Sequence, residues 1–171
     1  MVSPVVVAWT LRPVVAEDEE FLWEMLFYAS HSNDEPGVDP ADIRANPDLV
    51  GYIEGWKGLE RGGVIAEQGP RPVGAAWLRL LTDHDRANPV FVDGKTPELA
   101  IAVTPGMEGR GIGTAMLERL VADARGRFPA IVLSSRAENP AVNLYERTGF
   151  RVVAEVTNRI GTRSVKMVVE L

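Results

Sequence analysis

The sequence contains no cysteine and only two histidines in 171 residues. The absence of cysteine excludes disulfide bonds, thiolate metal sites and a cysteine nucleophile. The two histidines, His31 and His84, are too few for a histidine-rich metal cluster, so we expect no bound metal. His84 lies between Asp83 and Asp85 in a polar segment, which favours a solvated loop histidine over a catalytic one.

The chain also lacks an excess of basic residues, and no apolar run is long enough to cross a bilayer. Its net charge of −6 argues against nucleic acid and anionic membranes as partners, and is compatible with a cationic substrate such as an amine. Residues 1–10 have no basic flank and no cleavage-like site, so they read as a first strand instead of a signal peptide. We therefore expect a cytoplasmic protein.

The length and ordinary composition predict a single domain over residues 1–171. Strand-like patterns occupy residues 5–11, 63–67, 72–80, 98–103, 130–134, 150–156 and 164–171. Helical patterns occupy residues 17–29, 48–59, 112–124 and 140–149. Two polar segments interrupt this order, a proline-rich loop over 31–47 and an insertion over 82–96 that is placed to reach over an active site.

The stretch from Val103 to Thr114 joins the 98–103 strand to the 112–124 helix. Gly109, Gly111 and Gly113 remove every second side chain, so backbone N–H groups can point into one concavity. The helix start adds unpaired N–H groups and a partial positive charge. This combination is typical of a phosphate-binding site.

Two common phosphate motifs do not fit this stretch. The P-loop motif needs a lysine where Ile112 stands. The dinucleotide motif Gly-x-Gly-x-x-Gly fails because its third glycine would be Thr114 or Met116. A glycine-rich turn without a ligand is the alternative.

The spacing Val-x-Pro-x-x-x-Gly-x-Gly-x-Gly instead resembles the acyl-coenzyme A loop of the GNAT superfamily of N-acetyltransferases. The resemblance implies that amides in this loop hold the pyrophosphate of acetyl-CoA: those of Glu108, Gly109, Arg110, Gly111, Ile112, Gly113 and Thr114. The family usually has Gln or Arg where this chain has Glu108. If that side chain neutralises phosphate in the family, Arg110 would have to supply the charge here.

A second stretch, from Asn139 to Phe150, resembles the other GNAT signature, with an Asn, then Leu-Tyr and Gly-Phe. The resemblance implies that Tyr145 lies near the sulfur of the cofactor. The resemblance also implies that Asn139 contacts the cofactor, although it stands one residue closer to the tyrosine than in many relatives. Its role as a helix N-cap does not depend on that contact.

The resemblance implies an α/β (α+β) fold with a mixed, mostly antiparallel sheet of about seven strands and helices on both faces. It also implies transfer of an acetyl group to a primary amine by direct attack. Backbone groups of Ile101 and Val103 would pair with the pantetheine arm, and an N–H near Ala102 or Val103 would donate to the thioester oxygen. Glu98 would take the amine proton, and Tyr145 would donate to the leaving thiolate.

The same residues also have structural explanations, because Glu98 could be a solvated strand residue and Tyr145 a core residue. A coenzyme A-binding regulatory module without catalysis is therefore the alternative function. Candidates for the acceptor pocket are the aromatic residues between the first two strands, which could equally be core: Trp23, Tyr28, Tyr52 and Trp56. The acceptor, a small molecule or a peptide, stays open, as do a longer acyl chain and a homodimer contact through an exposed Trp56.

Overall fold

A computed structural model describes residues 8–57 and 62–171. Its seven strands form one sheet in the order β1-β2-β3-β4-β5-β7-β6. All neighbouring strands are antiparallel except β4 and β5, which run parallel. The strands are β1 (Trp9–Pro13), β2 (Gly63–Gln68), β3 (Arg71–Arg79), β4 (Glu98–Val103), β5 (Ala130–Arg136), β6 (Arg151–Thr157) and β7 (Arg163–Glu170). The predicted mixed, mostly antiparallel sheet is confirmed.

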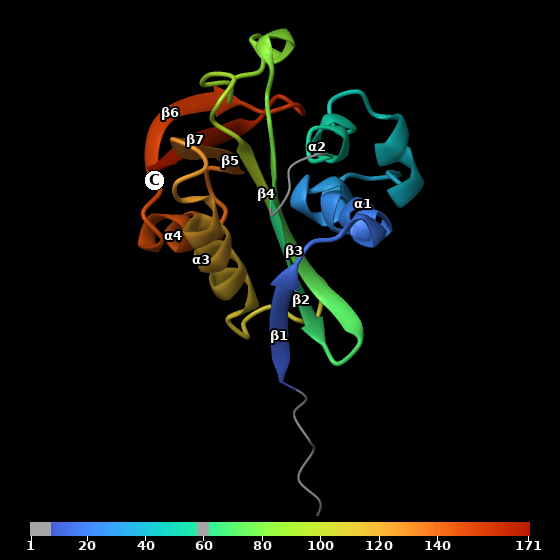
Figure 1. Cartoon of the computed structure of the whole chain (residues 1–171). Coiled ribbons are helices and arrows are strands. Elements are labelled where there is room, and N and C mark those ends of the chain that lie inside the picture. Colours follow the sequence, from blue (N-terminus) through green and yellow to red (C-terminus); the bar gives the residue numbers. More distant parts are fainter. Residues whose placement is uncertain (1–7, 58–61) are drawn as a thin grey trace, which may run out of the picture.

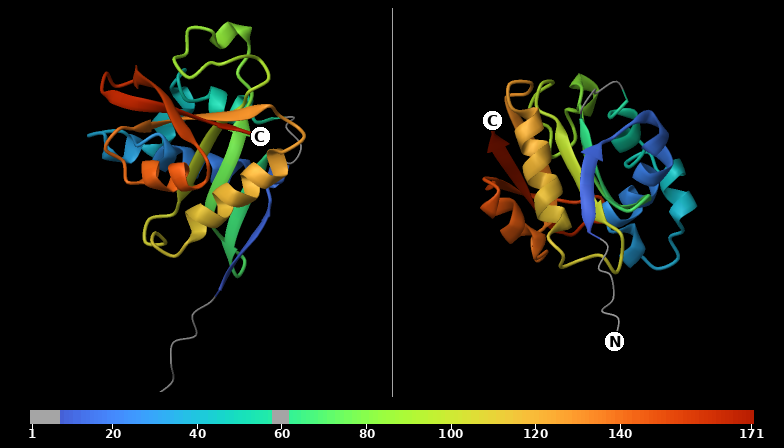
Figure 2. Two further views of the ribbon diagram at one scale, coloured as in Figure 1. Left: turned by 90° about the vertical axis from the view of Figure 1, so that its left-hand side faces the viewer. Right: turned by 60° about the horizontal axis from the view of Figure 1, so that its bottom comes forward.

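Helices cover both faces of this sheet (Figures 1 and 2). Helices α1 (Glu19–Ala29) and α2 (Gly51–Glu54) lie on one face, and α3 (Ile112–Ala124) and α4 (Ala141–Arg147) lie on the other. Short 3-10 turns occur at η1 (Ala16–Asp18), η2 (Ser32–Asp34), η3 (Pro40–Ala45) and η4 (Asp83–Asp85). No helix within the described ranges has the length and apolar character that crossing a bilayer requires.

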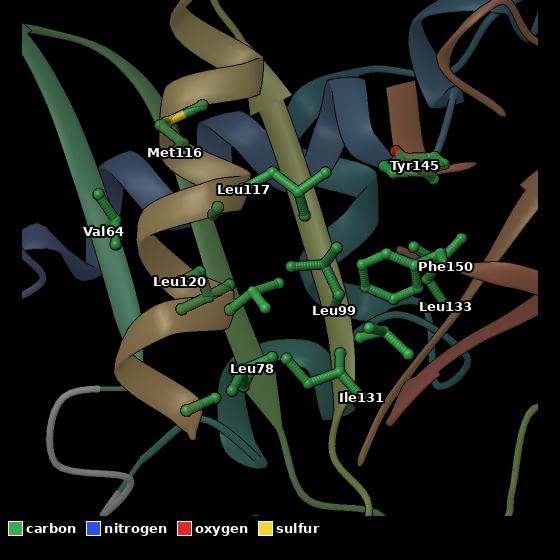
Figure 3. Packing of buried hydrophobic residues seen from close by; sticks show 14 of the residues in the cluster. Val64, Leu78, Leu99, Met116, Leu117, Leu120, Ile131, Leu133, Tyr145 and Phe150 are labelled. Carbon is green, nitrogen blue, oxygen red and sulfur yellow. The ribbon is translucent and has the colours of Figure 1, made fainter. Parts of the chain in front are cut away.

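Helix α3 packs its apolar stripe against the sheet, as its sequence period predicts. Leu117 and Leu120 are buried in one cluster with Leu78 and Leu99, and Figure 3 shows these side chains between the helix and the strands. A second cluster lies on the opposite face, where Leu22 and Met25 of α1 are buried together with side chains of β2, β3 and β4. Since side chains alternate along a strand, this arrangement sends Leu99 toward α3 and Glu98 toward α1 and α2.

The first strand and second helix differ from their predicted positions. The predicted strand over 5–11 lies partly outside the described residues, and β1 continues to Pro13, which lies opposite Val64. Proline is tolerated there because β1 is a sheet edge. The predicted helix over 48–59 shrinks to α2, which begins at Gly51 and has Gly55 as its C-cap; glycine is a weak helix former. Residues 58 and 59 lie outside the described part.

Candidate active site

The parallel strands β4 and β5 share one register pair, Glu98 with Val132, and no other pairing between them exists in the described structure. Past this pair the strands separate. Thr104 N–H bonds to Val73 of β3, so backbone groups of every second β4 residue face β3. By this alternation, Ile101 and Val103 turn their N–H and C=O groups toward the gap.

This gap is part of a cleft of about 910 Å³. Residues of α4, of the end of α1, of the start of α2 and of the 82–96 insertion also line the cleft. The η4 turn of this insertion stands at the top of Figure 1. The predicted site residues that line it are Glu98, Ile101, Ala102, Val103, Glu108, Gly113, Asn139 and Tyr145. Gly109, Arg110, Gly111, Ile112 and Thr114 are not among the residues that line it.

The glycine loop offers backbone donors. Gly109 and Gly111 have φ angles of 74° and 80°, a left-handed conformation that glycine adopts without strain. Within the described chain, the N–H groups of residues 108–114 have no acceptor of normal hydrogen-bond geometry. Ile112 buries its side chain in the core, so only its backbone could reach a ligand.

Two charged side chains of this loop behave differently. The carboxylate of Glu108 accepts the N–H of Gly106 at 2.7 Å, so it stabilises its own loop. Arg110 is exposed and has no ion-pair partner in the part of the chain that the structure describes. The Arg110 guanidinium is therefore available to bind a phosphate, whereas the Glu108 carboxylate is occupied by its hydrogen bond to Gly106.

Tyr145 of α4 lies beside Phe150, with the ring centroids 6.1 Å apart (Figure 3). The residue is only 8% exposed, and its hydroxyl has no hydrogen-bond partner among the described residues. Burial raises the pKa of Tyr145 to about 12. The hydroxyl oxygen itself keeps some solvent access, and Tyr145 lines the cleft, so a ligand bound there could supply its missing hydrogen bond. Asn139 holds the helix start, since its side-chain oxygen accepts the N–H of Ala141 at 2.9 Å.

Glu98 lies at the start of β4 beneath α2 and is 1% exposed. One carboxylate oxygen accepts Nε and Nη2 of Arg79 at 2.9 and 2.6 Å, and the other accepts the Tyr52 hydroxyl at 2.5 Å. Burial and the charge of Glu98 raise the pKa of Tyr52, so its hydroxyl stays protonated. Burial alone would lower the pKa of Arg79, but Glu98 raises it.

The comparison with known families adds to this geometry. Residues 7–150 match the model of the Acetyltransferase (GNAT) family, which is most of the chain. The chain belongs to this family. A search of curated proteins gave no match.

Solved GNAT structures share the fold at low identity. The yncA protein of Salmonella typhimurium, solved with its cofactor acetyl-CoA, is 21% identical at a TM-score of 0.69, covering 96% of this chain and 94% of that one. A ribosomal-protein-alanine N-acetyltransferase from Brucella melitensis is 20% identical at 0.66, covering 95% and 99%. The aminoglycoside acetyltransferase AAC(6')-Ib, solved with coenzyme A and kanamycin, is 21% identical at 0.63, covering 95% of each chain.

Sequence reasoning missed several residues of this GNAT cleft. Arg79, Arg136, Arg159 and His31 all line it. Arg159, in the turn between β6 and β7, donates to the Ser30 carbonyl at 3.2 Å and to Ser32 Oγ at 3.1 Å, and pairs with Glu35. No local pattern marks the three arginines, because their partners lie far away in the sequence.

The four candidate pocket aromatics of this GNAT chain divide evenly. Tyr28 and Tyr52 line the cleft. Trp23 lies outside it, with the Arg44 guanidinium 5.0 Å from its ring centroid. Trp56 is buried in the second cluster, together with Leu22 and Met25 of α1. The prediction of an exposed Trp56 at a dimer contact was therefore wrong. His84 lies on the wall of the cleft in the exposed η4 turn.

Proposed function

We propose that this protein transfers an acetyl group from acetyl-CoA to a primary amine by direct attack. The observation that carries the proposal is the separation of β4 from β5, which leaves a strand edge unpaired and leads it into a loop with free N–H groups. The relatives solved with acetyl-CoA or coenzyme A support this choice of donor. We take residues 1–171 as one acyl-CoA N-acyltransferase domain.

The residues present fit a nucleotide thioester. An elongated arm needs backbone partners along its length, and Ile101 and Val103 turn theirs toward the gap. A diphosphate needs several donors and positive charge, which the N–H groups of 108–114, the start of α3 and Arg110 supply. Gly113 lines the cleft without a side chain, so a ligand can approach its backbone closely.

When bound, acetyl-CoA supplies an acetyl thioester. The protein must hold this thioester and donate a hydrogen bond to its oxygen. It must also accept a proton from the amine and donate one to the departing sulfur. We assign the hydrogen bond to a backbone N–H near Ala102 or Val103. We assign proton donation to the departing sulfur to Tyr145, whose raised pKa keeps it protonated at neutral pH. For the amine proton the sequence predicts Glu98 as the base, a carboxylate that accepts hydrogen bonds from Arg79 and Tyr52.

The substitution Tyr145→Phe tests the proposal. We expect turnover, measured as release of free thiol from acetyl-CoA across an amine panel, to fall by about 10²-fold or more. We expect the coenzyme A dissociation constant, measured by calorimetry, to stay within about threefold, because the loop donors are untouched. The unfolding midpoint should not fall, since the hydroxyl has no partner to lose among the described residues.

Unchanged turnover in Tyr145→Phe would remove the acid role. The absence of thiol release by the wild type with every amine, together with normal coenzyme A binding, would favour the alternative, a coenzyme A-binding regulatory module. The structural relatives include enzymes named for protein and aminoglycoside acceptors, so the panel should contain peptides and small polyamines. Homodimer formation, cytoplasmic location and the acyl-chain length stay predictions from the sequence.

A further inference from the structure

His31 occupies an unusual backbone position at the edge of the cleft. It follows the last turn of α1 and has φ 57° and ψ 22°, the left-handed conformation. Among the described residues it is the only one besides glycine with a positive φ. Helices commonly end on such a residue, but glycine usually fills it because other side chains add strain. A histidine at this position is therefore less stable than a glycine would be, which suggests that the imidazole has a function.

The imidazole can be reached from the cleft. His31 lines the cleft, and its side chain is 33% exposed. Its Nδ1 lies 3.4 Å from Asp34 Oδ2 in the following η2 turn. A carboxylate beside Nδ1 favours the tautomer with the proton on Nδ1, which leaves a lone pair on Nε2.

Three charged groups surround this imidazole. Burial and the positive charge of Arg136 on β5 lower the pKa of His31, while Asp34 and Glu138 oppose that shift. The net result is a pKa below the ordinary value of 6.5. The ring is therefore neutral near pH 7 and able to accept a proton.

Glu98, by contrast, is already engaged. Its two carboxylate oxygens accept three hydrogen bonds from Arg79 and Tyr52. Protonating this carboxylate would leave the Arg79 cation buried without its counter-charge, which is costly. Of the two candidate bases, His31 is the one with an open nitrogen and no counter-charge to lose.

We propose that His31 is the catalytic base that takes the proton from the acceptor ammonium. This inference rests on the proposed acetyltransferase function. In the step, one N–H bond of the ammonium breaks and its proton goes to His31 Nε2, and from there to water. The neutral amine then forms the new C–N bond as the C–S bond breaks. A second amine proton reaches the leaving sulfur through Tyr145, so one proton is released for each amide formed.

The test uses His31→Asn and His31→Gly, because both residues accept the left-handed backbone. We expect turnover to fall by about 10²-fold in both variants. We expect the unfolding midpoint to stay the same or rise, and coenzyme A binding to stay unchanged. The wild-type kcat/KM should fall on acidification with an apparent pKa below 6.5, and the variants should lose this limb. Added imidazole should partly restore His31→Gly.

The matched control is Asn33→Ala, in the same η2 turn but outside the cleft lining, which should keep full turnover. An independent readout is proton NMR, since the chain has only two histidines and the variant identifies the His31 signal. A His31 pKa above 6.5, or variants with full turnover and an unchanged acid limb, would overturn the base role and leave the acetyltransferase function standing. A wild type that consumes no acetyl-CoA with any amine would overturn both.

Discussion

Arg79 and Glu98 form the most deeply buried ion pair of the described structure, with side chains 7% and 2% exposed. The guanidinium carbon of Arg79 also lies 3.6 Å from the ring centroid of Tyr52. Gly51 leaves room for this arrangement, because a Cβ there would come within 2.8 Å of Arg79 Nη1. These residues join α2 to the strands below the cleft.

Breaking this pair at one side should destabilise the protein strongly. Arg79→Met leaves the Glu98 carboxylate buried without its cation, which we expect to lower the free energy of unfolding by about 3–5 kcal/mol in urea titrations. The double variant Arg79→Met with Glu98→Gln removes both charges and should recover part of that loss. Equal losses in the single and double variants would show that the pair contributes little beyond packing.

Glu98 could be singled out from the sequence by family resemblance, but its partners could not. Arg79 lies 19 residues away and Tyr52 lies 46 residues away. Only the register of β3 against β4 brings Arg79 opposite Glu98. The surroundings of His31 could not be predicted from the sequence either, since the charge of Arg136, which acts on its imidazole, comes from β5.

At the scale of an element, the unit from β4 through the loop to α3 combines two uses of glycine. Gly111 is needed for a left-handed backbone, with φ 80°. Gly113 is already within α3, and an added Cβ would meet only Leu144 at 3.8 Å and Val103 at 4.0 Å, which is ordinary contact. Its lack of a side chain therefore has no structural explanation within the described protein and points to a ligand.

Two alanine substitutions should separate these uses. Gly113→Ala should raise the free energy of unfolding by up to about 1 kcal/mol, because alanine favours helix. It should also weaken coenzyme A binding by about tenfold or more, measured by calorimetry. Gly111→Ala should lower the free energy of unfolding by about 1–2 kcal/mol through backbone strain. Normal coenzyme A affinity in Gly113→Ala would mean that no ligand approaches this backbone.

Elements with a strong apolar period were predictable from the sequence, and those that depend on tertiary contacts were not. The helix over 112–124 has the predicted bounds because its stripe, from Ile112 to Ala124, alone fixes the buried face. The second helix was predicted too long because Leu49, Ile53 and Trp56 do recur at helical spacing and are buried, although only residues 51–54 are helical and turns flank them on both sides. The spacing of these three residues reflects their burial against α1 and the sheet and does not require one long helix.

At the scale of the whole molecule, the sheet consists of two halves, β1–β4 and β5–β7, joined by one strand pair. Arg159 adds a second connection, since it ties the β6–β7 turn to the end of α1 and to η2 across the cleft. Its partners lie 124 to 129 residues away in the sequence. This contact limits how far the two walls of the cleft can separate.

We expect Arg159→Ala to lower the free energy of unfolding by about 1–3 kcal/mol, because half-buried partners lose charged hydrogen bonds. The KM for the acceptor should rise more than kcat falls, and coenzyme A affinity should be unchanged. The matched control is Arg163→Ala, whose 3.7 Å contact with Glu155 joins side chains that are 68% and 62% exposed. That control should change the free energy of unfolding by less than about 0.5 kcal/mol. Equal effects of the two substitutions would contradict a bridging role.

The unpaired inner edge of β4 has a consequence for the stability of the protein as well as for its chemistry. A thioester arm that lies along this edge would act as an eighth member of the sheet, supplied from outside the polypeptide. At a free concentration one hundred times its dissociation constant, such a guest adds about 2.7 kcal/mol to the folded state. The protein's resistance to heat and proteases would then follow the acetyl-CoA supply of its surroundings.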